Sequence, residues 1–203
     1  MLNTCTNCGE YNVEKEIIGD GKYAKCPACG HRQEINRMPL FCITGASGIG
    51  KSTICRELFL REKEYIVLES DILWNDLYNT PEDNYREYNE LKLRLCKNIS
   101  QIGKPVVLCG CSTPQGIEVC KERRYFSTVY YLAVVGSDEL LRKRLTKGRN
   151  VEDNDWVNSS IDFNRWLKEN GDKTEPRITL LDITDISKDE AAVLIDSWIT
   201  ERM

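Results

Sequence analysis

The sequence lacks the features that mark membrane and secreted proteins. No apolar run approaches the ~20 residues that a helix needs to cross a bilayer, and no basic stretch followed by an apolar one opens the chain. We therefore expect neither a membrane span nor a secretory signal. No segment is dominated by Lys and Arg, and the formal net charge is −4. This balance argues against a mainly electrostatic nucleic-acid or membrane binder, although it does not exclude a local basic patch.

Internal repeats and low-complexity tracts are also missing, which excludes solenoid and linker architectures. The single histidine, His31, lies beside a group of N-terminal cysteines. Catalysis by a cysteine with a histidine base is therefore not expected in the rest of the chain. The hydrophobic fraction of 41% and the charged fraction of 30% are ordinary for a globular protein that folds around its own core.

Cysteine, by contrast, is abundant, with ten residues that fall into two groups. Six are scattered in apolar or mixed surroundings, and we expect them to be thiols: Cys42, Cys55, Cys96, Cys109, Cys111 and Cys120. The other four form two C-x₂-C-G units, Cys5 to Gly9 and Cys26 to Gly30.

This spacing predicts a structural zinc site with the ligands Cys5, Cys8, Cys26 and Cys29. Two residues between cysteines let both sulfurs face one metal, and four thiolates leave no open position for catalysis. Two disulfides, or thiols without metal, are the alternatives. Residues 10–25 would form a hairpin that turns at Gly19-Asp20-Gly21. Such a zinc ribbon could bind nucleic acid, dock a protein or only stabilise the fold.

A boundary near residues 36–39 separates this ribbon, 1–37, from a larger domain, 38–203. Continuous apolar segments alternate there with helical patterns, which predicts an α/β fold with a five-stranded parallel sheet covered on both faces. The expected strands are 40–44, 65–68, 105–109, 128–135 and 178–181.

The expected helices include one over 80–102 with Pro81 at its first position, one that Ser137 caps, and a last one that a Ser187–Glu190 capping box begins. The polar stretch 149–171 is expected to be a mobile helical element.

A phosphate-binding loop follows the first of these strands and matches G-x-x-x-x-G-K-[ST] at every fixed position. Its backbone N–H groups would surround the phosphates of ATP, Lys51 would contact the β- and γ-phosphates, and the Ser52 hydroxyl would bind Mg²⁺. A glycine-rich turn with an incidental Lys-Ser is the alternative. The predicted nucleotide-binding residues are Gly45, Ala46, Ser47, Gly48, Ile49, Gly50, Lys51, Ser52 and Thr53.

With this loop, the chain from Leu40 onward resembles the P-loop nucleotide and small-metabolite kinases, a group with adenylate, cytidylate, shikimate and gluconate kinases and chloramphenicol phosphotransferase. Glu69-Ser70-Asp71 is similar to the acidic pair after the second strand of metabolite kinases. The resemblance implies that Asp71 lies beside the acceptor hydroxyl and takes its proton, and that Glu69 helps to hold Mg²⁺. A helix N-cap is the alternative role for Asp71.

Three further segments extend the resemblance. The turn Gly110-Cys111-Ser112 is similar to the acceptor-binding turn after the third strand. The segment 140–149 resembles the helix that leads into the lid, which implies that Arg142 and Arg149 close over the phosphates within a lid-like region of about 146–172. A solvated basic face is the alternative. The segment 181–187 resembles the turn that passes the adenine.

These observations predict a cytoplasmic, ATP-dependent kinase for a small acceptor, which could be a nucleoside, a nucleotide or a hydroxylated metabolite. No Asp at the end of the third strand resembles the magnesium ligand of motor and switch ATPases, which favours a kinase. Two alternatives stay open at this point. One is a nucleic-acid-linked ATPase or polynucleotide kinase that grips its substrate with the ribbon. The other is a non-enzymatic nucleotide-binding regulator that docks through the ribbon.

Overall fold

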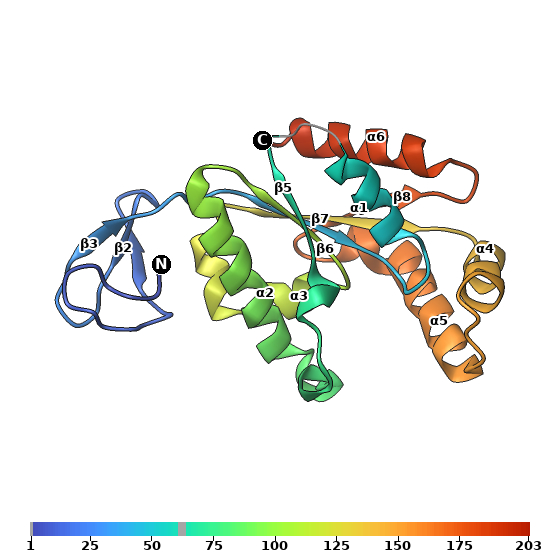
Figure 1. The fold of residues 1–203 in the computed structure, drawn as a ribbon, viewed down its shortest axis with the longest axis horizontal. Coiled ribbons are helices and arrows are strands. Elements are labelled where there is room, and N and C mark those ends of the chain that lie inside the picture. The colour runs from blue at the N-terminus through green and yellow to red at the C-terminus, as the bar shows by residue number, and fades with distance from the viewer. Residues whose placement is uncertain (1, 61–63) are drawn as a thin grey trace.

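A five-stranded parallel sheet forms the centre of the larger part of the chain (Figure 1). The computed structural model describes residues 2–60 and 64–203. The strands lie in the order β5-β6-β4-β7-β8, and every neighbouring pair is parallel. Their bounds are β4 (Leu40–Thr44), β5 (Ile66–Glu69), β6 (Val106–Cys109), β7 (Val129–Val135) and β8 (Ile178–Asp182). The predicted α/β class and the parallel sheet are confirmed.

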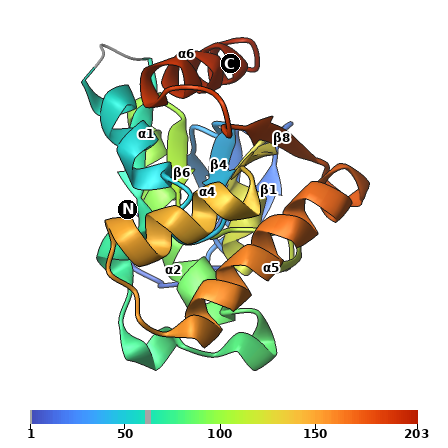
Figure 2. The same cartoon turned by 90° about the vertical axis from the view of Figure 1, so that its right-hand side faces the viewer.

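Helices cover both faces of this sheet, as the continuous apolar strands require (Figure 2). Alternate side chains of β4 enter opposite cores: Phe41 and Ile43 enter one, and Leu40 and Cys42 the other. The first core is closed by α1 (Lys51–Phe59), α4 (Asp138–Lys143) and α6 (Lys188–Thr200). The second is closed by α2 (Arg86–Ile99) and α3 (Pro114–Ile117).

Helix α5 (Asn154–Asn170) occupies the stretch that was expected to be a mobile helical element. It has 17 residues, and the Asp153 carboxylate caps its start by accepting from the Asp155 and Trp156 amides. Ile161 is buried in the first core and Leu167 in the second. The sparse apolar residues of this segment therefore anchor it to the sheet.

The helix predicted over 80–102 is shorter than expected. Pro81–Asp83 forms a separate 3-10 turn, and Asn84 and Tyr85 both have φ of 57°, a left-handed conformation that interrupts a helix. The α-helix begins only at Arg86 and ends at Ile99, and a 3-10 turn over Ser100–Ile102 follows it. The predicted cap of the last helix is confirmed on one side, because the Ser187 hydroxyl accepts from the Glu190 amide.

The N-terminal residues form a small antiparallel sheet of β1 (Glu16–Ile18), β2 (Tyr23–Lys25) and β3 (Arg32–Glu34). The predicted turn at residues 19–21 joins β1 to β2, and all three of its residues have positive φ. The third strand was not predicted, because three polar residues carry no apolar alternation. We call this part of the structure, residues 2–37, the ribbon.

The ribbon packs against α2 and the 3-10 turn Lys121–Tyr125 (Figure 1). Glu122 forms a buried ion pair with Lys97 of α2, and the Lys97 ammonium also donates to Asn3 of the ribbon. The Tyr125 hydroxyl donates to the Val13 carbonyl at 2.9 Å. These contacts lie beside the edge of the large sheet at which its strands begin, because β4 follows the ribbon directly.

In the described part of the chain, every helix is too short or too polar to traverse a lipid bilayer.

Candidate functional site

The phosphate-binding motif forms the loop between β4 and α1, at the edge where the parallel strands end. Gly45 has φ of 147°, and a Cβ there would lie 2.5 Å from the Val134 carbonyl oxygen, so the loop can follow this path only with glycine. The side chains of Ala46 and Ile49 are buried and anchor the loop to the core. Helix α1 begins at Lys51, so the free amides of its first turn point toward the space that the loop surrounds.

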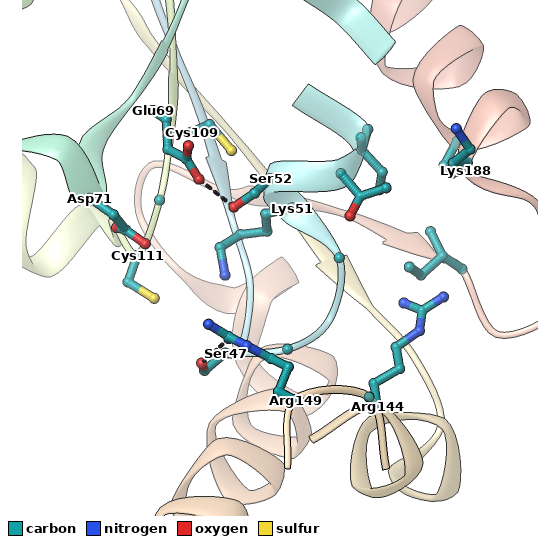
Figure 3. A pocket seen from close by; sticks show the side chains of 18 of the residues that line it. Ser47, Lys51, Ser52, Glu69, Asp71, Cys109, Cys111, Arg144, Arg149 and Lys188 are labelled. Atoms are coloured by element: carbon teal, nitrogen blue, oxygen red, sulfur yellow. Dashed lines mark hydrogen bonds between the residues drawn. The ribbon is translucent and has the colours of Figure 1, made fainter. Parts of the chain in front are cut away.

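A cleft with a volume of about 730 Å³ opens over this loop (Figure 3). The cleft is completed by the ends of β5 and β6, the start of α6 and the segment after α4. Its lining residues are Ser47, Gly48, Gly50, Lys51, Ser52, Thr53, Ile54, Glu69, Asp71, Cys109, Gly110, Cys111, Arg144, Gly148, Arg149, Ile183, Ile186, Ser187, Lys188 and Ala191.

Lys51 and Ser52 meet at the floor of the cleft. The Lys51 ammonium donates to the carbonyl oxygens of Gly45 at 2.8 Å and of Ala46 at 2.9 Å, which holds the cation above the loop. The Ser52 hydroxyl donates to a carboxylate oxygen of Glu69 at the end of β5 (Figure 3). A hydroxyl and a carboxylate oxygen thus converge beside the loop, and oxygen ligands of this kind suit Mg²⁺.

Asp71 lines the opposite side of the cleft and faces the space above Lys51 (Figure 3). It lies inside the 3-10 turn Ser70–Leu73, whose N-cap position is Glu69. The alternative role of Asp71 as an N-cap is therefore not realised. Gly110 packs so closely beneath this turn, with φ of 157°, that a Cβ there would overlap the Ser70 hydroxyl.

The predicted acceptor-binding turn is only partly in the cleft. Gly110 and Cys111 line it, whereas Ser112 is buried behind them and does not. The Ser112 amide donates to the Thr44 hydroxyl at 3.2 Å, and its own hydroxyl accepts from Lys92 at 2.9 Å. Cys109, which also lines the cleft, is buried and forms a hydrogen bond with the Cys55 thiol. The hydrogen bond and the burial both raise the pKa of Cys109 and keep its thiol neutral.

Of the arginines at the end of α4 and just after it, Arg144 and Arg149 reach the cleft and Arg142 does not. The Arg149 guanidinium donates to the Ser47 hydroxyl at 3.3 Å, and Arg144 donates to the Ile49 carbonyl of the loop. Arg142 instead bonds Asn158 of α5 at 3.2 Å. Arg142 and Arg144 are two residues apart, which places their side chains about 200° apart around the helix and so on opposite faces. A π-helical turn over Arg144–Gly148 then leads to Arg149. Periodicity alone could not reveal which of the two faces meets the cleft.

The residues after β8 form another part of the lining. Ile183 and Ile186 present apolar surface, and Ser187 and Ala191 lie at the start of α6. Asp182 just before them accepts from the amide and the hydroxyl of Thr184, which fixes the turn. The segment that resembles the adenine-side turn of nucleoside monophosphate kinases thus lines the cleft.

The four N-terminal cysteines form a separate cluster at the tip of the ribbon. Their sulfurs all lie within 4.8 Å of one another, with 3.7 Å between Cys5 and Cys29 and 3.8 Å between Cys8 and Cys26. Zinc–sulfur bonds of about 2.3 Å give a tetrahedron with edges of about 3.8 Å, so the sulfurs could hold a zinc ion.

Two of these sulfurs lie in surroundings that favour thiolate, the form that binds zinc: nearby backbone N–H groups lower the pKa of Cys5 and of Cys29. The pKa of Cys8 is raised, because a lowering bond from the Glu10 backbone is outweighed by burial and by bonds to the other cysteine sulfurs. His31 bonds the Thr6 hydroxyl at 3.1 Å and is not one of the clustered ligands.

No protein-family model matches the sequence, and no curated protein matches it. Solved structures match over most of the chain. The tunicamycin resistance protein of Deinococcus radiodurans has a TM-score of 0.58 at 18% identity, covering 80% of this chain and 96% of that one. A sugar kinase of Janibacter gives 0.57 at 16% identity, with 80% and 95% covered. A gluconokinase of Sinorhizobium meliloti gives 0.54 at 15% identity, with 82% and 98% covered.

Identities this low establish the architecture and not the activity. The chain has the fold of P-loop kinases, with a small antiparallel ribbon and a four-cysteine cluster at its N-terminus.

Proposed function

We propose that this protein is an ATP-dependent kinase that transfers the γ-phosphate to a hydroxyl group of a small acceptor. One observation carries the proposal: the phosphate-binding loop with Lys51, the Ser52–Glu69 pair and the Asp71 carboxylate line the same cleft. Parallel α/β sheets bind their ligands at the edge where the strands end, and this cleft lies there.

The nucleotide would lie over the loop, with its phosphates against the backbone N–H groups of residues 45–53 and the positive end of α1. Lys51 would exchange its bonds to the loop carbonyls for the β- and γ-phosphates. Ser52 and Glu69 would hold Mg²⁺, which neutralises charge on the β- and γ-phosphate oxygens when bound. Ile183 and Ile186 would pack against the base.

Asp71 would orient the acceptor hydroxyl and take its proton while the hydroxyl oxygen forms a bond to the γ-phosphorus. The bond from that phosphorus to the β–γ bridging oxygen breaks, and ADP leaves with the electron pair. Arg144 and Arg149 would neutralise the charge that accumulates on the transferred group. We do not assign Arg142 this role, because it bonds Asn158 outside the cleft.

The acceptor class follows from the carboxylate. A general base serves a hydroxyl nucleophile, since a phosphate acceptor is already ionised and needs no proton removed. This chemistry favours a hydroxylated metabolite or nucleoside over a nucleoside monophosphate. The gluconokinase and the sugar kinase with the same fold are named for hydroxylated substrates, which agrees with this preference.

We also propose that residues 1–37 and 38–203 are the two domains, that the cysteine cluster binds one structural zinc ion, and that the protein works in the cytoplasm. Within the lid-like region of 146–172, closure is proposed for the segment around Arg149, because α5 contributes to both cores. The ribbon lies at the edge where the strands begin, away from the phosphate-binding loop. This position disfavours a polynucleotide kinase that grips its substrate with the ribbon.

A screen for ADP release across nucleosides, nucleoside monophosphates, sugars and sugar acids, with ATP and Mg²⁺, tests the proposal. With the best acceptor, Lys51→Ala should remove measurable transfer. Asp71→Asn should lower kcat by about 10²–10⁴-fold, the usual contribution of a general base. Full activity of Asp71→Asn would refute its role as the base. ATP binding without transfer to any acceptor would favour a nucleotide-binding regulator.

A further inference from the structure

Lys92 of α2 is a buried cation that the proposed phosphate transfer does not use. Its side chain is 0% exposed, and the ion pairs found among the described residues do not include it. The ammonium instead donates to the Cys111 carbonyl at 3.2 Å and to the Ser112 hydroxyl at 2.9 Å. Both partners belong to the turn after β6, one side of which faces the cleft.

This arrangement is costly, which makes its position informative. Removing an ammonium from water without a carboxylate partner disfavours its charged form, and burial lowers the pKa of Lys92. A methionine of similar length would fill the same space without that penalty. Fold stability therefore does not explain a lysine at this position, whereas two directed hydrogen bonds to one turn do.

The turn that Lys92 holds is the acceptor side of the cleft. Cys111 lines the cleft together with Asp71 (Figure 3). Ser112 is fixed twice, through its hydroxyl to Lys92 and through its amide to the Thr44 hydroxyl. Without Lys92, the Cys111 carbonyl and the Ser112 hydroxyl would lose a common donor beneath the turn.

Tyr88, one helical turn before Lys92, supports the other half of the same surface. Its hydroxyl donates to the Ser70 carbonyl at 2.8 Å, directly before Asp71. The Lys92 ammonium lies 4.5 Å from the centre of the Tyr88 ring, within the range of a cation–π contact. Helix α2 thus holds the turn that carries Asp71 through one side chain and the turn at Cys111 through the next.

We propose that Lys92 is a positioning residue that fixes the turn Gly110–Ser112 for acceptor binding. The proposal rests on the proposed function for the identity of the ligand, and on the contacts above for the role of the lysine. Lys92 is not among the residues that line the cleft, so it would not contact the nucleotide, and we expect its effect on the acceptor.

The test uses the full-length protein and Lys92→Met. Alkylation of the exposed Cys111 thiol by iodoacetamide is followed by mass spectrometry of its peptide, which needs no acceptor. The loss of two hydrogen bonds should raise this rate about five- to tenfold. With the acceptor from the screen, the KM for the acceptor should rise by a similar factor, while the KM for ATP changes little. The unfolding midpoint should not fall, because the variant no longer buries an ammonium.

Lys104→Met is the matched control, because this lysine lies before the start of β6 with its side chain 41% exposed, and it should leave the alkylation rate and both KM values unchanged. Ser112→Ala keeps the lysine and removes one of its acceptors, so it should give an intermediate increase if Lys92→Met fails to fold. An unchanged Cys111 rate in the lysine variant, or in Ser112→Ala if the former does not fold, overturns the proposal. An unchanged acceptor KM beside a faster rate also overturns it, since the role would then be only structural. A failed acceptor screen refutes the proposed function. The alkylation result then decides only whether Lys92 fixes the turn Gly110–Ser112.

Discussion

Breaking the buried ion pair between α2 and the 3-10 turn Lys121–Tyr125 should strongly destabilise the whole chain. Glu122 and Lys97 both have fully buried side chains, and Arg94 adds a second bond to Glu122 at 2.9 Å. Glu122→Leu keeps the volume and removes the counter-charge, which leaves the Lys97 cation buried with only uncharged partners, the Asn3 amide oxygen and the Tyr125 ring. Breaking a buried pair in this way costs about 3–5 kcal/mol.

For a chain of about this size, each 1 kcal/mol lowers the unfolding midpoint by about 2–4 °C, so the expected decrease is about 6–20 °C. Thermal and urea unfolding, followed by circular dichroism, would measure it. Glu14→Gln is the matched control at the same interface. Its carboxylate is 46% exposed and pairs with Lys121 at 3.0 Å, and its loss should cost less than about 1 kcal/mol.

A double variant, Glu122→Leu with Lys97→Met, separates charge burial from packing. If the unpaired cation causes the loss, the double variant should recover most of the stability, because replacing a whole buried pair by apolar residues is often neutral. The reasoning fails if Glu122→Leu costs less than about 1 kcal/mol, or if the double variant is no more stable than the single one. Either result would mean that an unpaired Lys97 cation is not the cause of the lost stability.

Three other predictions concern the two sites. Gly110→Ala should raise the KM for the acceptor about tenfold or more in steady-state assays, because its φ of 157° disfavours a Cβ; an unchanged KM would contradict the packing of this turn. Arg144→Ala should lower kcat about 10-fold or more, and Arg142→Ala should have little effect; the reverse order would show that Arg142, and not Arg144, reaches the transferred phosphate. Cys26→Ser should lower both the zinc content, by metal analysis, and the unfolding midpoint; equal zinc in the variant and the unchanged protein would exclude the cysteine cluster as the zinc site.

The pH dependence of stability should reveal the buried lysine. Burial lowers the pKa of Lys92 in the folded chain below its ordinary value of 10.5, which applies to the unfolded chain. Between these two pKa values the unfolded chain binds more protons, so this group makes the folded state more stable as the pH rises. The stability advantage expected for Lys92→Met should therefore shrink toward pH 10. Urea unfolding of both proteins across this range measures it, and a constant difference would contradict a cation at this position.

Local sequence patterns were sufficient for the sheet and for two groups of site residues. Continuous apolar strands have few alternatives to a parallel sheet between helices, which is why all five were predicted. The phosphate-binding loop and the cysteine cluster depend on short spacings, within which backbone geometry alone brings the important atoms together. Lys51 and Ser52 are neighbours in the chain, and each pair of cysteines is separated by two residues. Their conformation is therefore largely a local property.

Contacts between distant segments were decided only by the tertiary structure. Packing decides which face of α4 meets the cleft, and therefore that Arg144 and not Arg142 reaches it, and the left-handed residues before Arg86 shorten α2. Lys92 looks like a surface lysine in the sequence, yet packing against the turn after β6 buries it. Glu122 likewise becomes the buried partner of Lys97 only because remote segments meet. Charge and periodicity along a chain do not specify which segments meet, because that choice minimises the free energy of the whole fold.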